Sequence, residues 1–197
     1  MLILASTSVY RRELLSRLRL PFEAIPPGVD ETPIAAESPA QAAERLSVAK
    51  ARAVSIRYPD ALVIGSDQTA TLDGRAIIGK PGNHERARAQ LRAASGQSMC
   101  FHTGLALVRE RDGFLWQTVV DTRVRFRTLS DDEIETYLLE ERPYDCAGSA
   151  RSEALGVSLL QSIECNDPTA LVGLPLIALC DAFRAAGLNI LSAVRPT

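Results

Sequence analysis

The sequence predicts an α/β fold, in which strands and helices follow one another along the chain. Strand-like and helix-like segments alternate through most of its length. The continuous apolar run 61–65 is typical of a strand that is covered on both faces. Serine capping signatures at Ser38 and Ser130 mark the starts of two helices. Together these observations favour a sheet with helices packed against it.

The chain begins with a predicted strand, a short polar turn and a helix. The strand is the apolar run 2–5, and a Ser-Thr-Ser turn follows it. Leu14, Leu15 and Leu18 then recur on one helical face, with Ser8 as the N-cap. The proline-containing stretch 21–37 is expected to be irregular. The elements expected after it are a helix from Ser38-Pro39 that stops before Pro59, a strand over 61–65, a hairpin with Asp73-Gly74 as its two-residue turn, a helix from Asn83 towards Gly96, a hairpin over 98–127, a helix from Ser130, a loop over 144–156, a strand over 156–164 and a helix over 174–186.

Two arginines stand where helix electrostatics disfavours them. Arg11 and Arg12 lie in the first turn of the predicted helix, where the positive end of the helix dipole costs a cation roughly 0.3–1 kcal/mol. A bound anion would reverse this preference. Backbone N–H groups, the hydroxyls of Ser6 and Ser8 and two guanidiniums suit a phosphate group. The alternative is that both arginines are solvated and Ser8 is an ordinary N-cap.

Asp67 is the strongest single candidate for a catalytic residue. It follows the apolar run 61–65, and we expect it just beyond the carboxyl end of that strand. Open α/β sheets place their reacting groups at such ends. A carboxylate there can act as a general base toward water, hold a divalent cation, or do both. The alternative is an aspartate that bonds its own backbone in a turn.

Glu31, Lys50 and Lys80 add charges that suit the same chemistry. Glu31 is expected in an exposed loop, but if it faces Asp67 the pair offers the oxygen ligands that Mg²⁺ or Mn²⁺ prefers. Lys50 lies one step off the apolar stripe of its helix, so it either reaches an anionic cleft or snorkels at the surface. Lys80 stands between a glycine and a proline in a tight loop. Cations, a metal and a base are what triphosphate chemistry needs. Because the sequence has no P-loop motif, we do not expect a P-loop enzyme.

Bulk properties narrow the function classes. The 197 residues are expected to form a single domain, 1–197, with a net charge of −2 and no basic stripe, which argues against nucleic-acid binding. The apolar stretch 171–180 is too short to span a bilayer, and the N-terminus lacks a signal-peptide pattern. Two histidines and four scattered cysteines make a zinc site of the usual spacing improbable. We expect a cytoplasmic protein with no membrane partner.

In combination, these segments resemble the Maf family of nucleoside triphosphate pyrophosphatases. The resemblance implies hydrolysis between the α and β phosphorus atoms, which yields a monophosphate and pyrophosphate, with a divalent metal as cofactor. It also implies a Maf/ITPase-like fold, an elongated mixed sheet with flanking helices and two lobes around a central cleft, and a possible homodimer. The matching segments are LILASTSVYRREL (2–14), VDET (29–32), SVAKAR (47–52), IGSDQ (64–68), GKP (79–81), CAGSARSEALG (146–156) and LVGLPL (171–176).

The resemblance assigns roles residue by residue. Asp67 would be the proton acceptor, and Asp67 and Glu31 are the residues we expect to hold the metal. The remaining assignments are Ser6, Arg11 and Arg12 for phosphate binding, with Glu31, Lys50 and Lys80 completing the catalytic set.

Within the family, the chain is most similar to the branch that acts on 7-methyl-GTP. Tyr10 before the double arginine, Gln68 after the catalytic aspartate and Glu153 in the late loop carry this similarity. Methylation at N7 makes guanine a cation, and its Watson–Crick edge offers N–H donors that Glu153 can accept. Tyr10 can stack on the cationic ring, worth roughly 0.5–2 kcal/mol. Alternatively, Tyr10 packs on the core at the helix start.

Two other functions remain open at this point. A pyrophosphatase for dTTP and UTP would share the fold, although glutamine in place of Glu153 would suit it better. A nucleotide-binding regulator of cell division would use the cleft without turnover. Asp67, Glu31 and Lys80 argue against a pure binder, because binding alone needs no base positioned for water.

Overall fold

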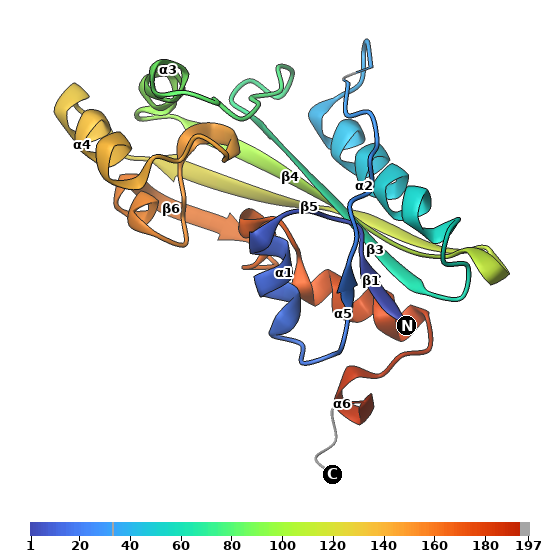
Figure 1. Ribbon diagram of the computed structural model, residues 1–197. Coiled ribbons are helices and arrows are strands. Elements are labelled where there is room, and N and C mark those ends of the chain that lie inside the picture. Colours follow the sequence, from blue (N-terminus) through green and yellow to red (C-terminus); the bar gives the residue numbers. More distant parts are fainter. Residues whose placement is uncertain (33, 194–197) are drawn as a thin grey trace.

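The computed structural model describes residues 1–32 and 34–193 and shows a mixed six-stranded sheet with helices on both faces (Figure 1). The strand order is β2-β1-β3-β4-β5-β6, with parallel pairs among the first three strands and antiparallel pairs from β3 onward. This arrangement confirms the predicted α/β class. The strands are β1 (Leu2–Leu4), β2 (Glu23–Ala24), β3 (Leu62–Thr71), β4 (Ser98–Arg109), β5 (Phe114–Phe126) and β6 (Leu160–Cys165).

The helices divide the molecule into two lobes that share the sheet (Figure 1). In the first lobe, α1 and α5 pack on one sheet face around Leu4 and Leu105, and α2 packs on the opposite face around Val63. In the second lobe, α3 and α4 pack around Phe101 and Phe126 at the other end of the long strands. The helices are α1 (Val9–Ser16), α2 (Pro39–Ser55), α3 (His84–Ala94), α4 (Asp131–Glu141), α5 (Leu176–Ala185) and α6 (Ile190–Ala193).

The local helix signals are confirmed. The hydroxyl of Ser8 accepts from the backbone N–H of Arg11, and Asn83 caps α3 in the same way. Ser38 and Ser130 both form full capping boxes. Each of these contacts spans three residues, so the sequence alone contains all that determines it. Within the described residues, none of the helices combines the length and apolar character of a membrane span.

Several predicted boundaries are wrong. The strand predicted over 61–65 continues as β3 to Thr71, because β4 pairs with it over that whole length. The predicted two-residue turn at Asp73-Gly74 is a longer loop. The Asp73 carboxylate accepts from the backbone N–H groups of Arg75 and Ala76, and after the loop Ile78 forms a single antiparallel bridge with Ala70 instead of a paired strand. The first part of 156–164 is a 3₁₀ turn, and the short strand β2 lies within the stretch expected to be irregular.

Two glycines allow α2 to pack unusually close to the sheet. A Cβ atom on Gly65 would lie 2.0 Å from the carbonyl oxygen of Ser47, and one on Gly104 would lie 2.2 Å from that of Ala43. Both carbonyls belong to α2. Gly104 is also the direct cross-strand partner of Asp67. The close approach therefore brings the side chains of α2 onto the part of β3 that carries Asp67.

Candidate active site

A cleft of about 910 Å³ opens beside β3, between the two lobes. The strand β1 pairs with β3 only as far as Ile64, so in the described chain the edge of β3 between Ile64 and Ala70 borders this cleft. The walls come from segments far apart in sequence: the turn and first part of α1 (residues 5–11), the loop 26–31, α2, the loop 77–80, the loop 145–153 and the turn 171–173.

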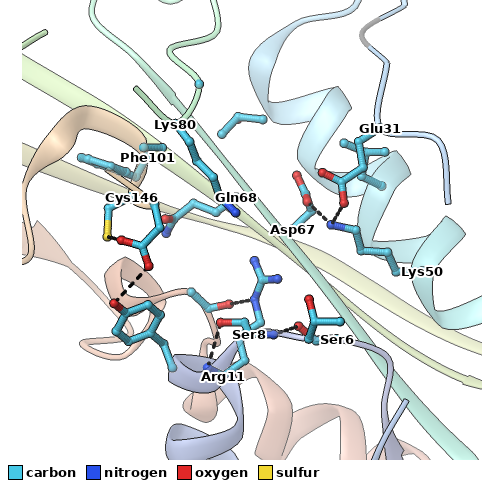
Figure 2. Close-up of a pocket in the computed structure, with 18 of the residues that line it drawn as sticks. Ser6, Ser8, Arg11, Glu31, Lys50, Asp67, Gln68, Lys80, Phe101 and Cys146 are labelled. Atoms are coloured by element: carbon cyan, nitrogen blue, oxygen red, sulfur yellow. Dashed lines mark hydrogen bonds and ion pairs between the residues drawn. The ribbon is translucent and has the colours of Figure 1, made fainter. Parts of the chain in front are cut away.

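Lys50 joins the two carboxylates at the centre of the cleft. Its Nζ atom lies 2.5 Å from Oδ1 of Asp67 and 2.7 Å from Oε1 of Glu31. The Lys50 side chain is only 7% exposed, so the surface-lysine alternative is wrong. Glu31 keeps a side chain that is 59% exposed, yet it does face Asp67 across the lysine (Figure 2). Asp67 lies within β3 rather than beyond its end, and its carboxylate is buried.

Burial and neighbouring charges shift the pKa values of the Asp67 and Glu31 carboxylates in opposite directions. Desolvation raises the pKa of Asp67, and the charges of Lys50 and Arg11 offset this only in part. Desolvation also raises the pKa of Glu31. The hydrogen bond from Lys50 and the positive charges of Lys50, Lys80 and Arg11 outweigh it, so the pKa of Glu31 lies below the ordinary value. Burial therefore makes the carboxylate of Asp67 more basic than that of an ordinary aspartate.

Arg11 enters the cleft from the start of α1. Its Nε atom donates to the carbonyl oxygen of Gly173 at 2.8 Å, and the guanidinium points toward Asp67 (Figure 2). Burial lowers the pKa of Arg11, whereas Asp67 and Glu31 raise it. In the preceding turn, the buried hydroxyl of Ser6 accepts from the backbone N–H of Ser8 at 3.1 Å. Ser6, Ser8 and Arg11 therefore line the same cleft, and their binding of a phosphate group stays a prediction.

Arg12 does not join them. Its side chain is exposed, and it is absent from the described residues that line the cleft. Val9, Tyr10 and Arg11 line the cleft, and each further residue of an α-helix is turned by about 100°, so Arg12 lies one step beyond the part of α1 that faces the cleft. The structure therefore corrects the expected pair of guanidiniums to one.

Lys80 reaches the cleft from the loop after β3. It is exposed, and its side chain points toward the space beside Asp67 in Figure 2. Its charge contributes to the lowered pKa of Glu31. Three cationic side chains, Arg11, Lys50 and Lys80, thus surround the two carboxylates.

Tyr10 and Glu153 are both among the residues that line the cleft. The Tyr10 hydroxyl donates to Oδ2 of Asp145 at 3.4 Å, and the Arg151 guanidinium lies 5.8 Å from the centre of the Tyr10 ring. Arg151 also bonds Oδ1 of Asp145 at 2.7 Å. A cation of the chain itself therefore lies over one face of the Tyr10 ring.

Asp145 and Arg151 were not among the predicted site residues. They lie 135 and 141 positions from Tyr10 in the sequence, and nothing local to either one marks its contact. Arg151 stands inside the matched segment 146–156, which was the only available signal.

A second group of potential ligands lies outside the cleft. The side chains of Cys100, His102 and Asp121 bring one potential ligand atom each to within 4.8 Å of the others. They come from β4 and β5, and His102 Nδ1 lies 2.6 Å from Oδ1 of Asp121. The expected metal residues, Glu31 and Asp67, are not part of this group.

Comparisons with known proteins identify the family of the chain. A family model described as "Maf-like protein" matches residues 1–186, which include every residue of the cleft. The chain belongs to the Maf family. It is 57% identical over 192 residues to a protein of Albidiferax ferrireducens named "7-methyl-GTP pyrophosphatase", covering 98% of this chain and 96% of the relative. A protein of the same name from Aromatoleum aromaticum is 59% identical over 187 residues, covering 95% of this chain and 96% of the relative.

Two solved structures are less similar to this Maf chain. The Ham1 protein of Staphylococcus aureus aligns with a TM-score of 0.46 at 12% identity, covering 64% of this chain and 72% of that chain. A HAM1 protein from Coxiella burnetii aligns with a TM-score of 0.45 at 17% identity, with the same coverage.

Proposed function

We propose that this Maf protein hydrolyses 7-methyl-GTP between the α and β phosphorus atoms, releasing 7-methyl-GMP and pyrophosphate. The observation that carries this proposal is the contact of Lys50 with both Asp67 and Glu31, with Arg11 and Lys80 around them. A cleft with cations and a buried base suits an anionic triphosphate and an attacking water. Relatives above 50% identity carry the name of this activity. Other modified nucleotides of the cytoplasmic pool are further candidate substrates.

In the proposed reaction, Asp67 accepts the proton of the attacking water. Its raised pKa makes it a stronger base than an ordinary aspartate, while the contact with Lys50 holds the carboxylate in place and favours its ionised form. Arg11, Lys80 and the hydroxyl of Ser6 bind the phosphate oxygens. The hydrogen bonds of Arg11 to Gly173 and of Ser6 to Ser8 hold two of these groups in place before the reaction, so that they stabilise the charge that moves to the leaving pyrophosphate.

Asp67 and Glu31 are also the residues that would hold a divalent cation. Oδ2 of Asp67 and Oε2 of Glu31 accept no hydrogen bond from a described residue, so each carboxylate keeps one oxygen free of such bonds. Hard oxygen donors of this kind fit Mg²⁺ or Mn²⁺. When bound, the cation would take charge from the phosphate oxygens.

The base is proposed to lie between Tyr10 and Glu153. Binding of the cationic ring on the face of Tyr10 that Arg151 now covers would require Arg151 to move, because two cations on one ring face repel each other. The exposed carboxylate of Glu153, whose Oε2 accepts from the hydroxyl of Ser152 at 3.4 Å, would accept the N–H donors of the guanine edge. Asp145 adds a second negative charge at this end of the cleft.

The test is a comparison of pyrophosphate release from 7-methyl-GTP, GTP, dTTP and UTP by the purified chain with Mg²⁺ or Mn²⁺. We expect the highest kcat/KM for 7-methyl-GTP. A higher kcat/KM for dTTP or UTP would favour the pyrimidine enzyme instead. Binding of triphosphates without pyrophosphate release would favour a regulator. The homodimer implied by the family stays a prediction, which sedimentation velocity tests.

A further inference from the structure

Gln68 lines the cleft, and its amide is directed at the backbone of residues 170 and 171. Its Nε2 atom donates to the carbonyl oxygens of Ala170 and Leu171 at 3.0 and 3.1 Å, and it lies 2.9 Å from the hydroxyl oxygen of Thr103. The Thr103 hydroxyl itself donates to the carbonyl oxygen of Ala170 at 3.0 Å. Because acceptors surround this end of the amide, it must be the NH₂ group.

These contacts fasten one turn, residues 170–173, onto the middle of the sheet. The last residue of this turn, Gly173, accepts at its carbonyl oxygen from the buried hydroxyl of Ser66 at 2.9 Å and from Nε of Arg11 at 2.8 Å. Gly173 has a φ of 113°, and a Cβ atom there would lie 3.5 Å from Nε of Arg11. The carbonyl that orients Arg11 therefore depends on a turn that side chains of β3 and β4 hold in place.

We propose that Gln68 and Thr103 are positioning residues, which fix the 170–173 turn so that its Gly173 carbonyl holds the Arg11 guanidinium at the phosphate site. This inference rests on the proposed function of Arg11 as a phosphate binder. It gives Gln68 a role different from contact with the base: its effect reaches the substrate through the turn and Arg11. Thr103 is fully buried and is absent from the lining residues, so its effect on the substrate can only be indirect.

The chemistry of the contacts explains why this arrangement matters. An arginine carries five N–H donors, and the bond from Nε to Gly173 leaves the two terminal nitrogens free for a phosphate. Without a fixed carbonyl, the long side chain would sample other rotamers, and binding a phosphate would have to order it again. Loss of the turn contacts should thus weaken phosphate binding whatever base the nucleotide carries.

The experiment compares the wild-type chain with the variants Thr103→Val, Gln68→Met and Arg11→Ala. For each protein, calorimetry measures the Kd of inorganic tripolyphosphate, and kinetic assays measure kcat/KM for 7-methyl-GTP and for GTP. Thr103→Val keeps the side-chain shape and removes only the hydroxyl. We expect Thr103→Val and Gln68→Met each to raise the Kd by about 3- to 10-fold and to lower both kcat/KM values by a common factor. In the Arg11→Ala background, Thr103→Val should have no further effect, because both changes act through one guanidinium.

Thr122→Val is the matched control. Thr122 is a buried threonine of the neighbouring strand β5, and its hydroxyl donates to the sulfur of Cys165 and to no other group among the described residues. This variant should leave every value at the wild-type level. If Thr103→Val does not fold, Ser66→Ala removes another contact to Gly173 and takes its place. A change in the 7-methyl-GTP to GTP ratio for Gln68→Met, or additive losses with Arg11→Ala, would overturn the inference. A wild-type chain that binds tripolyphosphate but releases no pyrophosphate would instead overturn the proposed function, and the Kd values would still decide the inference.

Discussion

At the scale of single residues, the buried contact between Asp67 and Lys50 gives the candidate site its chemical character. An aspartate with a lysine at 2.5 Å would ordinarily have a lowered pKa, but burial outweighs the lysine and the pKa of Asp67 is raised. The carboxylate is thus both fixed in place and more basic than an exposed aspartate.

Replacement of Asp67 by asparagine tests its role as the base. Asp67→Asn keeps the shape of the side chain and removes its ability to take up a proton, so kcat for 7-methyl-GTP should fall at least about 10²-fold. The Kd of tripolyphosphate should stay near the wild-type value, because the cations of the cleft remain. Asp121→Asn, on an exposed carboxylate outside the cleft, is the control. Near-normal turnover by Asp67→Asn would show that another group accepts the proton.

The pH dependence of kcat/KM reports the same group. The base must be ionised, so activity is lost as the pH falls through the pKa of Asp67, and the acid limb should lie above the ordinary aspartate value of 3.8. Lys50→Met removes the charge and the hydrogen bond that lower this pKa. The acid limb of that variant should therefore move to higher pH. A limb that stays in place or moves downward would contradict the assignment.

Glu153 tests the preference for the methylated base. Glu153→Gln removes the negative charge that complements the cationic ring but keeps the size of the side chain. The ratio of kcat/KM for 7-methyl-GTP to that for GTP should fall at least about threefold. Glu164→Gln, on an exposed carboxylate of β6, should leave the ratio unchanged. An unaltered ratio in Glu153→Gln would remove Glu153 from base recognition.

The sequence predicted the chemistry of these residues better than their contacts. Asp67 could be singled out because it follows a buried apolar run, and Lys50 because it lies one step off the apolar stripe of its helix. Glu31 was expected in an exposed loop, and the structure brings all three together. The neighbours of Tyr10 and Arg11 could not be predicted, since Asp145 and Gly173 lie 135 and 162 positions away along the chain. Contacts at such separations depend on the packing of both lobes and leave no local pattern.

At the scale of elements, the contact between α2 and the sheet positions Lys50. The helix approaches so closely because Gly65 and Gly104 leave no side chain beneath it. Helix starts were predictable here, because the caps at Ser8, Ser38 and Ser130 involve neighbours three residues away. The extension of β3 to Thr71 was not, because it depends on pairing with β4 more than 25 positions later.

Gly104→Ala tests this close packing. The added methyl group would meet the α2 backbone at Ala43, so the helix must move away from β4. Overpacking of this kind costs roughly 1–3 kcal/mol of the free energy of unfolding, measured by urea denaturation. Activity should fall as well, because Lys50 moves with the helix. Gly79→Ala is the matched control: a Cβ atom there meets nothing within 4 Å and the backbone has no positive φ. Equal stability of the two variants would contradict the packing account.

At the scale of the whole molecule, the cleft collects charged groups from both lobes. Arg11, Lys50 and Lys80 surround the carboxylates of Asp67 and Glu31, and the loop 145–153 adds Asp145 and Glu153. In Figure 2 the side chains of Glu31 and Cys146 stand on opposite sides of this space. Neither lobe could provide this arrangement alone, because α1 and α2 supply part of the lining and the 145–153 loop supplies another part.

The most direct measurement is a crystal structure of the chain with a non-hydrolysable 7-methyl-GTP analogue and Mn²⁺. The account predicts that the triphosphate contacts Arg11 and Lys80, that the α–β bridge faces the Asp67 carboxylate, and that the methylated base lies against Tyr10 and Glu153. A triphosphate bound away from Asp67, or a base seated at the end where Lys50 lies, would contradict it.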